Sequence, residues 1–197
     1  IMKNKSRLTC RSGLLVLMLC LLSIANPLKA QWIQTGLDGY YIRTITFSGS
    51  NIFVGTSGDG MFRSTNNGTS WSALNSGLVG LEFPAFAISG THLYAGSEGE
   101  GVFISTNNGT SWSSLAPLEN HFVFALAVSG TDLYAGVDGG GVFRSTNNGA
   151  SWTNSTSGMT NTRVTSLAIS GTNLFAGTFG GDGVYLSTNN GTTWTAL

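Results

Sequence analysis

The sequence predicts an all-β fold, a β-propeller built from four-stranded antiparallel blades. After residue 30 the chain is written in four copies of a repeat of about 40 residues, and such a period is typical of propellers and other repeat folds. Within each copy, short runs alternate apolar and polar residues with the period of a β-strand. Glycine-rich turn sequences interrupt these runs every eight to twelve residues, and no helical periodicity occurs after residue 30.

The first thirty residues resemble a secretory signal peptide. A basic start at residues 3–11 precedes an apolar run at residues 13–24, and residues 28–30 resemble a small-residue cleavage site. The run is shorter than the roughly 20 apolar residues that span a bilayer. We therefore expect a secreted protein, extracellular or periplasmic, with no membrane insertion after signal removal. An uncleaved anchor is the alternative.

Removing this segment changes the charge balance. Five of the nine Lys and Arg residues lie in it and all nine Asp and Glu residues follow it, so the remaining chain carries a net charge of −5. Binding to nucleic acid depends on Lys and Arg, so nucleic acid is not expected as a partner. Cys10 and Cys20 leave with the same segment, so neither a disulfide nor thiol chemistry is expected.

Each repeat carries a box with the pattern Ser-Thr-Asn-Asn-Gly-x-Ser/Thr-Trp, and successive box tryptophans are 41, 40 and 42 residues apart. A second block, first seen at residues 48–55, recurs upstream of every box. The serine, first asparagine, glycine and tryptophan of the four boxes are Ser64, Asn66, Gly68 and Trp71; Ser105, Asn107, Gly109 and Trp112; Ser145, Asn147, Gly149 and Trp152; and Ser187, Asn189, Gly191 and Trp194.

Each repeat reads as four short strands, which is the content of a propeller blade. In the first repeat these strands are expected at residues 42–47, 51–54, 60–64 and 71–74. A solenoid of stacked β units is the alternative. In either case a blade cannot bury both of its faces alone, so the core should consist of layers between neighbouring blades. The blades are predicted at about residues 40–78, 79–117, 118–157 and 158–197.

The box resembles the Asp-box, or BNR repeat, of sialidases, sortilin-type receptors, xyloglucanases and photosystem assembly factors of the Ycf48 type. Asparagine stands here where that family usually has aspartate. The resemblance covers four boxes and essentially the whole chain after residue 30. It implies a propeller, but it leaves the function open because these proteins do unrelated things.

The box has a structural role that follows from its residue types. The side-chain oxygen of Asn66 can accept from backbone N–H groups two or three residues on, closing a turn. Gly68 permits a left-handed step, and Trp71 should then plug the hairpin against the blade. The other three boxes should behave in the same way.

The beginning of the mature chain matches an outer strand. Residues 31–37 are in register with residues 71–78 and predict an isolated outer strand. The fourth repeat already ends with its own outer strand, so this opening strand has no partner within the chain. We therefore expect four blades of a larger propeller, six to eight blades by the family pattern, with further blades C-terminal to this chain.

A site for one asymmetric ligand must break the fourfold repetition, so the divergent positions are the candidates. The start of the innermost strand carries such residues in two columns, and aromatic rings with isolated Arg and Glu suit a glycan or a peptide. If these strands open at the central funnel, the columns line its mouth; ordinary exposed loops are the alternative. Further along, uniformly small residues (Thr46, Ala87, Ala127 and Ala168) are attributed to crowding near the axis. The two columns are Tyr40, Leu81, His121 and Thr162, and Tyr41, Glu82, Phe122 and Arg163.

The glycine-rich loops beginning at Gly55 and its equivalents form a second candidate, because every copy holds a carboxylate. A partial ring of negative charge would surround the funnel. Calcium needs six to eight oxygen ligands, which one or two carboxylates cannot supply, so no metal is expected and a solvated turn is the alternative. The carboxylates are Asp59, Glu98, Glu100, Asp138 and Asp182.

These features favour a secreted, non-catalytic binding module for a protein or glycan ligand, without a cofactor. One alternative is a fragment of a carbohydrate-active enzyme of sialidase or xyloglucanase type, and a second is a Ycf48-like assembly factor. A sialidase would require three converging arginines, but Arg63 and Arg144 share one repeat position, which leaves only Arg43 and Arg163. Glycoside hydrolysis needs two facing carboxylates, and the sequence leaves Asp38, Asp59, Glu82, Glu119 and Asp182 open for that role.

Overall fold

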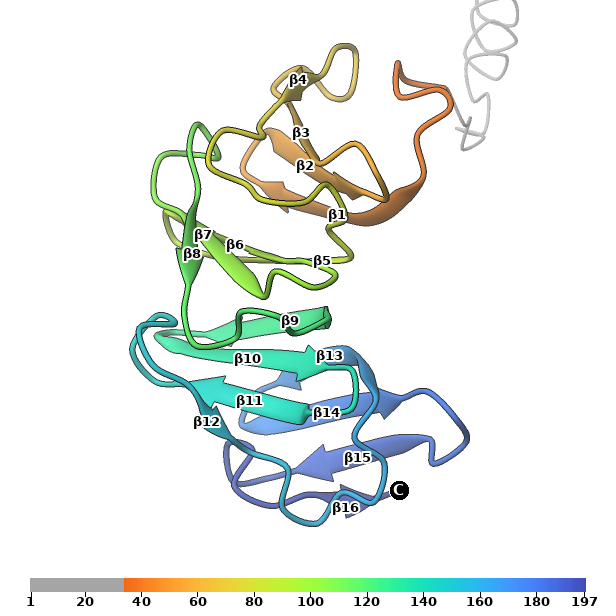
Figure 1. Cartoon of the computed structure of the whole chain (residues 1–197), viewed down its shortest axis with the longest axis vertical. Coiled ribbons are helices and arrows are strands. Elements are labelled where there is room, and N and C mark those ends of the chain that lie inside the picture. Colours follow the sequence, from red (N-terminus) through yellow and green to blue (C-terminus); the bar gives the residue numbers. More distant parts are fainter. Residues whose placement is uncertain (1–33) are drawn as a thin grey trace, which may run out of the picture. The chain divides into compact units, whose positions relative to one another are not determined.

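The computed structural model describes residues 34–197, so the predicted signal peptide at residues 1–30 lies outside the described residues. Strands build four separate antiparallel sheets of four strands each, every sheet ordered as the chain runs (Figure 1). The described residues contain no helix long and apolar enough to cross a membrane. The blades are β1 (Ile42–Ser48), β2 (Asn51–Thr56), β3 (Met61–Ser64) and β4 (Ser72–Ala73); β5 (Ala85–Ser89), β6 (His92–Gly96), β7 (Val102–Ser105) and β8 (Ser113–Leu115); β9 (Val123–Ser129), β10 (Asp132–Val137), β11 (Gly141–Ser145) and β12 (Thr153–Asn154); β13 (Val164–Ser170), β14 (Asn173–Thr178), β15 (Val184–Ser187) and β16 (Thr195–Ala196).

The predicted all-β propeller fold is confirmed, and the four strands expected in the first repeat are all present. The turn between β1 and β2 shows why the local sequence folds this way. Ser48 pairs with Asn51, which leaves two residues for the turn. The first of them, Gly49, has φ +58°, a value that tight hairpin turns require and that glycine adopts without steric cost.

Most of the hydrophobic core lies between neighbouring blades. One cluster joins the first two blades, where the rings of Phe53 and Phe86 stack with centroids 5.5 Å apart. A second joins the middle blades through Tyr94 and Leu126. A third joins the last two through Tyr134 and Val164. The facing surfaces of neighbouring blades thus bury one another, as the repeat predicted.

Within residues 34–197, no such cover lies on the outer face of the first blade, the face that carries Ile45 and Phe47. Ile45 is 57% exposed and Phe47 is 64% exposed, whereas Phe86 and Leu126, which occupy the position of Ile45 in the next two blades, are each 9% exposed. The difference follows from the stacking, because Phe86 and Leu126 pack on the preceding blade. The position is apolar in all of these blades, but only a neighbouring blade can bury it.

Two of the small residues of the innermost strands lie in the layers between blades. Ala87 belongs to the cluster between the second and third blades, and Ala127 belongs to the cluster between the third and fourth. Large side chains such as Leu126 enter these layers from the following blade. Packing between blades therefore favours a small residue at these two positions.

The turn in the box uses different hydrogen bonds from those expected. In the second blade, the side-chain oxygen of Asn107 accepts from the N–H of Ser111, four residues on, at 2.9 Å. The N–H groups two and three residues on are already engaged. Gly109 donates to Ser105 Oγ at 2.9 Å, and Thr110 donates to the Asn107 carbonyl at 3.2 Å. Two consecutive left-handed residues, Asn108 and Gly109, produce this wider loop.

The box tryptophans pack against the preceding blade. Trp112 and Trp194 are 4% and 3% exposed. The indole N–H of Trp112 donates to the Leu74 carbonyl at 2.8 Å, and that of Trp194 donates to the Ser155 carbonyl at 2.7 Å. Trp152 is also buried, at 9% exposure. Trp71 is only half-buried, because the described residues supply no complete blade for it to pack on.

Residues 34–37, the described part of the predicted outer strand at residues 31–37, form no strand. The segment nevertheless meets the box as expected from its register. The Thr35 carbonyl accepts from the indole N–H of Trp71 at 3.1 Å, as the Leu74 carbonyl does from Trp112.

Candidate functional site

A cavity of about 280 Å³ opens where the innermost strands of the four blades begin. Its residues come from all four blades, one equivalent position from each blade together with one further arginine. We call this site the axial mouth. It is lined by Arg43, Pro84, Phe124, Thr165 and Arg163.

Backbone irregularity aims these side chains at the mouth. In β1 the register shifts between Ile42 and Thr44, so Arg43 is an extra residue with no partner in β2. Phe124 and Thr165 are the extra residues of the corresponding shifts in β9 and β13. Bulges of this kind re-aim side chains and are common beside functional sites. In the second blade, Pro84 lies just before β5.

Each arginine of the mouth is held by a carboxylate from an adjacent blade. Arg43 Nη2 lies 2.8 Å from Glu98 Oε1, and Arg163 Nε lies 3.1 Å from Asp138 Oδ1. The arginine side chains are 38% and 46% exposed, against 18% and 35% for their carboxylate partners. A guanidinium offers five N–H donors, and each pair engages only part of that set. Both guanidiniums therefore keep free N–H donors for a ligand in the cavity, while a carboxylate balances the charge of each.

Aromatic surface adjoins the arginines. The Arg163 guanidinium lies over the Phe179 ring, 4.4 Å from its centroid. Phe122, which is 46% exposed, stacks on Phe124 with ring centroids 6.5 Å apart. A shallower cavity of about 190 Å³ continues along the innermost strands and shares Pro84, Phe124 and Thr165 with the mouth. The site thus combines guanidinium donors with flat apolar surface.

Glu82 is the acidic member of the predicted column. A hydrogen bond with Glu98 raises the pKa of Glu82 above its usual value, repulsion between the two carboxylates acts in the same direction, and Arg43 opposes both. Glu82 is exposed. Glu98 and Arg43 therefore act on the pKa of Glu82 in opposite directions at the edge of the mouth.

The structure brings together only some of the residues predicted for the mouth. Arg163 lines it, and Glu82 and Phe122 contact residues that do. Tyr41 is 77% exposed and is not part of the lining, and Tyr40 packs edge-on against Phe62 with ring centroids 5.1 Å apart. His121 is half-buried against the ring of Phe143, and its Nδ1 lies 3.1 Å from the Glu119 carbonyl.

The glycine-rich loops tie successive blades together near the mouth. The N–H groups of Gly58 and Gly60 both contact the Leu81 carbonyl of the next blade, at 3.1 and 2.9 Å. The N–H of Asp59 donates to Thr56 Oγ1 at 3.1 Å. These contacts give the loop a structural role.

Two other residues of the predicted loops make local hydrogen bonds, Glu100 through its backbone and Asp182 through its carboxylate. The Glu100 N–H donates to Ser97 Oγ at 3.0 Å, and Asp182 Oδ2 accepts from Thr160 Oγ1 at 3.1 Å. Within residues 34–197, no three His, Cys, Asp or Glu side chains are grouped so that they could hold a metal ion.

The remaining arginines lie away from the mouth, at the shared repeat position that predicted a structural role. Arg63 Nη1 donates to the Asn108 carbonyl at 3.0 Å, and Arg144 Nη2 pairs with Asp132 Oδ2 at 2.7 Å. The mouth therefore contains two arginines.

Comparison with known proteins agrees with this architecture. A family model described as the DUF6242 beta propeller domain matches residues 29–166. No curated protein matches the chain. An ancestral GH74 enzyme superposes with a TM-score of 0.68 at 22% identity, over 85% of this chain and 26% of the enzyme. The computationally designed Ika4 protein gives 0.65 at 15% identity, over 82% of this chain and 99% of the design. YCF48 from Cyanidioschyzon merolae gives 0.64 at 17% identity, over 85% of this chain and 59% of YCF48.

These structural likenesses show the fold. The chain spans only about a quarter of the length of the GH74 enzyme.

Proposed function

The chain belongs to the DUF6242 beta propeller domain family, and we propose that it acts as a non-catalytic binding module whose ligand enters the axial mouth. The ligand we propose is a peptide segment that presents a carboxylate beside an apolar side chain. Guanidinium groups bind carboxylates through charge-assisted, often paired hydrogen bonds. Flat apolar surface beside them suits an aromatic or aliphatic side chain.

The observation that carries this proposal is the departure from repetition at the mouth. One equivalent position per blade supplies Arg43, Pro84, Phe124 and Thr165 to a single cavity. A purely structural position would favour one residue type in all blades, as the box does. Four different side chains at one place are what a single asymmetric ligand requires.

A structural neighbour supports the ligand class. YCF48 has been solved bound to D1 peptide, and that structure superposes with a TM-score of 0.65 at 16% identity. An identity of 16% shows a shared fold only. Peptide binding by the present chain is therefore our inference.

The test is a peptide array with acidic and neutral members, probed with the protein from which residues 1–30 have been removed. We expect acidic peptides to bind. The double variant Arg43→Gln/Arg163→Gln should lower their affinity by about tenfold or more, since a hydrogen bond to a charged group contributes about 1.5–3 kcal/mol. The matched variant, Glu98→Gln/Asp138→Asn, keeps both guanidiniums but removes the carboxylates that pair with them. It should therefore raise the affinity for acidic peptides. Equal binding of acidic and neutral peptides, or insensitivity to both variants, would contradict the proposal.

A carbohydrate-active enzyme fragment is the second candidate, because Glu82 and Glu98 share a hydrogen bond and the pKa of Glu82 is raised. A raised pKa in one of two neighbouring carboxyl groups is the direction of shift that a general acid requires. Hydrolysis of chromogenic glycosides, abolished by Glu82→Gln and Glu98→Gln, would replace the binding proposal with this one.

We also propose that the four blades belong to a larger propeller, with a further blade covering the outer face of the first. Exposed Ile45 and Phe47 support this, since the equivalents of Ile45 in the next two blades are buried. The complete open reading frame tests it. Additional boxes at a spacing of about 40 residues are expected, and their absence would refute it.

A further inference from the structure

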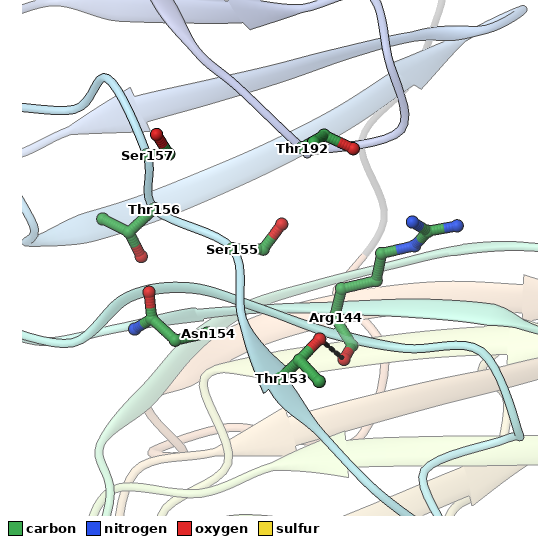
Figure 2. A pocket seen from close by; sticks show the side chains of 7 residues that line it. All are labelled: Arg144, Thr153, Asn154, Ser155, Thr156, Ser157 and Thr192. Atoms are coloured by element: carbon green, nitrogen blue, oxygen red, sulfur yellow. Dashed lines mark hydrogen bonds between the residues drawn. The ribbon is translucent and has the colours of Figure 1, made fainter.

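A second cavity, of about 450 Å³, lies between the third and fourth blades, away from the axial mouth. Figure 2 shows its side chains, which come mostly from β12 and the segment that follows it, with one residue from the box of the fourth blade. All of them are polar. They are Arg144, Thr153, Asn154, Ser155, Thr156, Ser157 and Thr192.

The cavity adjoins the place where one residue departs from the repeat. Three residues after the box tryptophan, the first two blades have Leu74 and Leu115. Leu74 packs on the box glycine of the next blade, so closely that a Cβ on Gly109 would lie 2.6 Å from Leu74 Cδ1. The third blade has Ser155 at this position. The serine side chain fills less space than that of leucine. A cavity with polar walls therefore replaces the apolar contact between the third and fourth blades.

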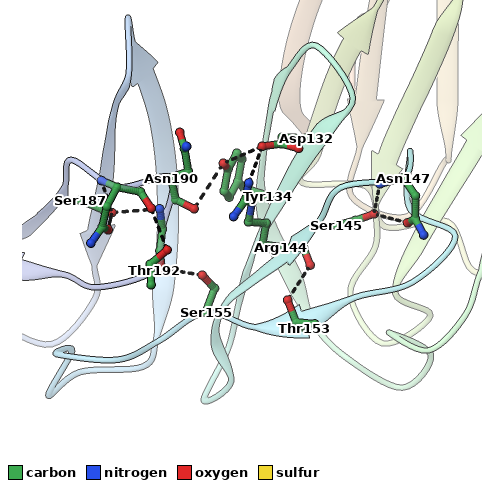
Figure 3. Close-up of polar contacts among 12 residues, drawn as sticks. Asp132, Tyr134, Arg144, Ser145, Asn147, Thr153, Ser155, Ser187, Asn190 and Thr192 are labelled. Atoms are coloured by element: carbon green, nitrogen blue, oxygen red, sulfur yellow. Dashed lines mark hydrogen bonds and ion pairs between the residues drawn. The ribbon is translucent and has the colours of Figure 1, made fainter.

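Three hydroxyl groups of the cavity already donate their hydrogens to the protein. Ser155 Oγ donates to the Gly191 carbonyl at 2.5 Å, and Thr153 Oγ1 donates to the Arg144 carbonyl at 3.2 Å (Figure 3). Thr192 Oγ1 donates to the Asn189 carbonyl at 2.8 Å. A hydroxyl that donates in this way keeps its lone pairs. These three groups therefore offer acceptors, and a ligand would have to bring donors.

Arg144 is the only charged residue of the lining, and its charge is balanced. Its Nη2 contacts Asp132 Oδ2 at 2.7 Å, and its guanidinium lies 5.9 Å from the centroid of the Tyr134 ring. Its Nε is buried and has no hydrogen-bond partner among the described residues. The cavity therefore combines a few N–H donors with several hydroxyl acceptors and has little net charge.

We propose that this cavity is a second binding site and that it takes a neutral, polyhydroxylated ligand, a sugar unit of a glycan. Its volume falls within the range of roughly 300–1,000 Å³ typical of small-molecule sites. An apolar ligand would find no aliphatic or aromatic side chain in the lining, and an ion would find no unbalanced charge. Sugar hydroxyls can donate to Ser155, Thr153 and Thr192 and accept from Arg144.

The decisive variant restores the repeat. Ser155→Leu introduces the side chain that the first two blades carry at this position, so it fills the cavity with a residue that the fold already accommodates. Thr192→Val is a milder change that removes one hydroxyl at nearly constant volume. Ser72→Leu is the matched control, because it makes the same chemical change on the exposed strand β4 of the first blade.

The experiment uses an array of neutral glycans, with sialylated glycans and peptides as comparators, followed by titration calorimetry with the strongest neutral glycan. We expect a neutral glycan to bind, Ser155→Leu to weaken it more than about tenfold, and Thr192→Val to weaken it about three- to tenfold, the worth of one hydrogen bond. Ser72→Leu should bind like the wild type. The thermal unfolding midpoint checks that each variant is folded.

Three results would overturn this proposal. They are the absence of any neutral glycan among the bound ligands, undiminished binding by folded Ser155→Leu, and a Ser155-dependent preference for peptides. None of them bears on the axial mouth, which lies elsewhere and has its own variants.

Discussion

The indole N–H of Trp112 donates a hydrogen bond of 2.8 Å to the main-chain carbonyl of Leu74, 38 residues earlier and in the preceding blade. The same relation joins Trp194 to Ser155 at 2.7 Å. It links the box of one blade to the outer strand of the blade before. The box thus closes its own turn and fastens two blades together.

The tryptophans predict a difference that isolates this hydrogen bond. Trp112→Phe should lower the free energy of unfolding by about 1–3 kcal/mol more than Trp152→Phe, because it leaves the Leu74 carbonyl without its donor. Both substitutions remove a similar volume, but the Trp152 Nε1 has no partner among the described residues. Urea denaturation measures both. Equal losses would show that the bond contributes nothing beyond packing.

The box asparagine should tolerate aspartate but not alanine. The side-chain oxygen of Asn107 accepts from Ser105 Oγ and from the Ser111 N–H, and a carboxylate keeps both acceptors. Asn107→Ala should cost about 1–3 kcal/mol, since the Ser111 N–H and Ser105 hydroxyl lose their acceptor, whereas Asn107→Asp should cost clearly less. Thermal denaturation of the two variants compares them, and an aspartate variant as unstable as the alanine variant would count against this interpretation.

The carboxylate pair predicts a pH dependence. Because the pKa of Glu82 is higher in the folded than in the unfolded state, its contribution to stability is present below the usual pKa and is lost as the pH rises through the raised value. The stability of the wild type relative to Glu82→Gln should therefore fall as the pH increases from about 3 to about 8. Denaturation at a series of pH values measures it.

The matched control for this pH dependence is Glu98→Gln, which removes the neighbouring carboxylate. In this variant the pKa of Glu82, followed by NMR of its side-chain carboxyl, should move back toward its usual value. An unchanged pKa would show that Glu98 is not the cause.

The strands could be predicted from the sequence because alternation and glycine turns are local signals, and the 40-residue period makes every copy a check on the others. The bulges could not be predicted in this way. Counting alternate residues through Ile42, Arg43 and Thr44 assumes one partner for each residue, but the register shift leaves Arg43 without one. The sequence therefore pointed to Tyr41 and its equivalents, two residues before the position that lines the mouth.

The second cavity could not be predicted from the sequence, for a different reason. Ser155 is one small polar residue between the short strand β12 and a polar loop, and nothing local distinguishes it. Ser155 stands out only when it is aligned with Leu74 and Leu115. Its effect on packing can be seen only once the box glycine of the next blade is known to lie against it. Sequence alignment of the repeats could have flagged the difference, but contact across blades is needed to interpret it.

The stacking of the blades can be tested by one comparison at equivalent positions. Ile45→Ala and Leu126→Ala remove large aliphatic side chains from the same place in the first and third blades, where they are 57% and 9% exposed. Measured by urea denaturation of the protein from which residues 1–30 have been removed, Leu126→Ala should lower the free energy of unfolding by about 2–5 kcal/mol, and Ile45→Ala by about 0.5 kcal/mol or less. Equal losses at the two positions would contradict the account, because they would mean that each blade holds its own core without its neighbour.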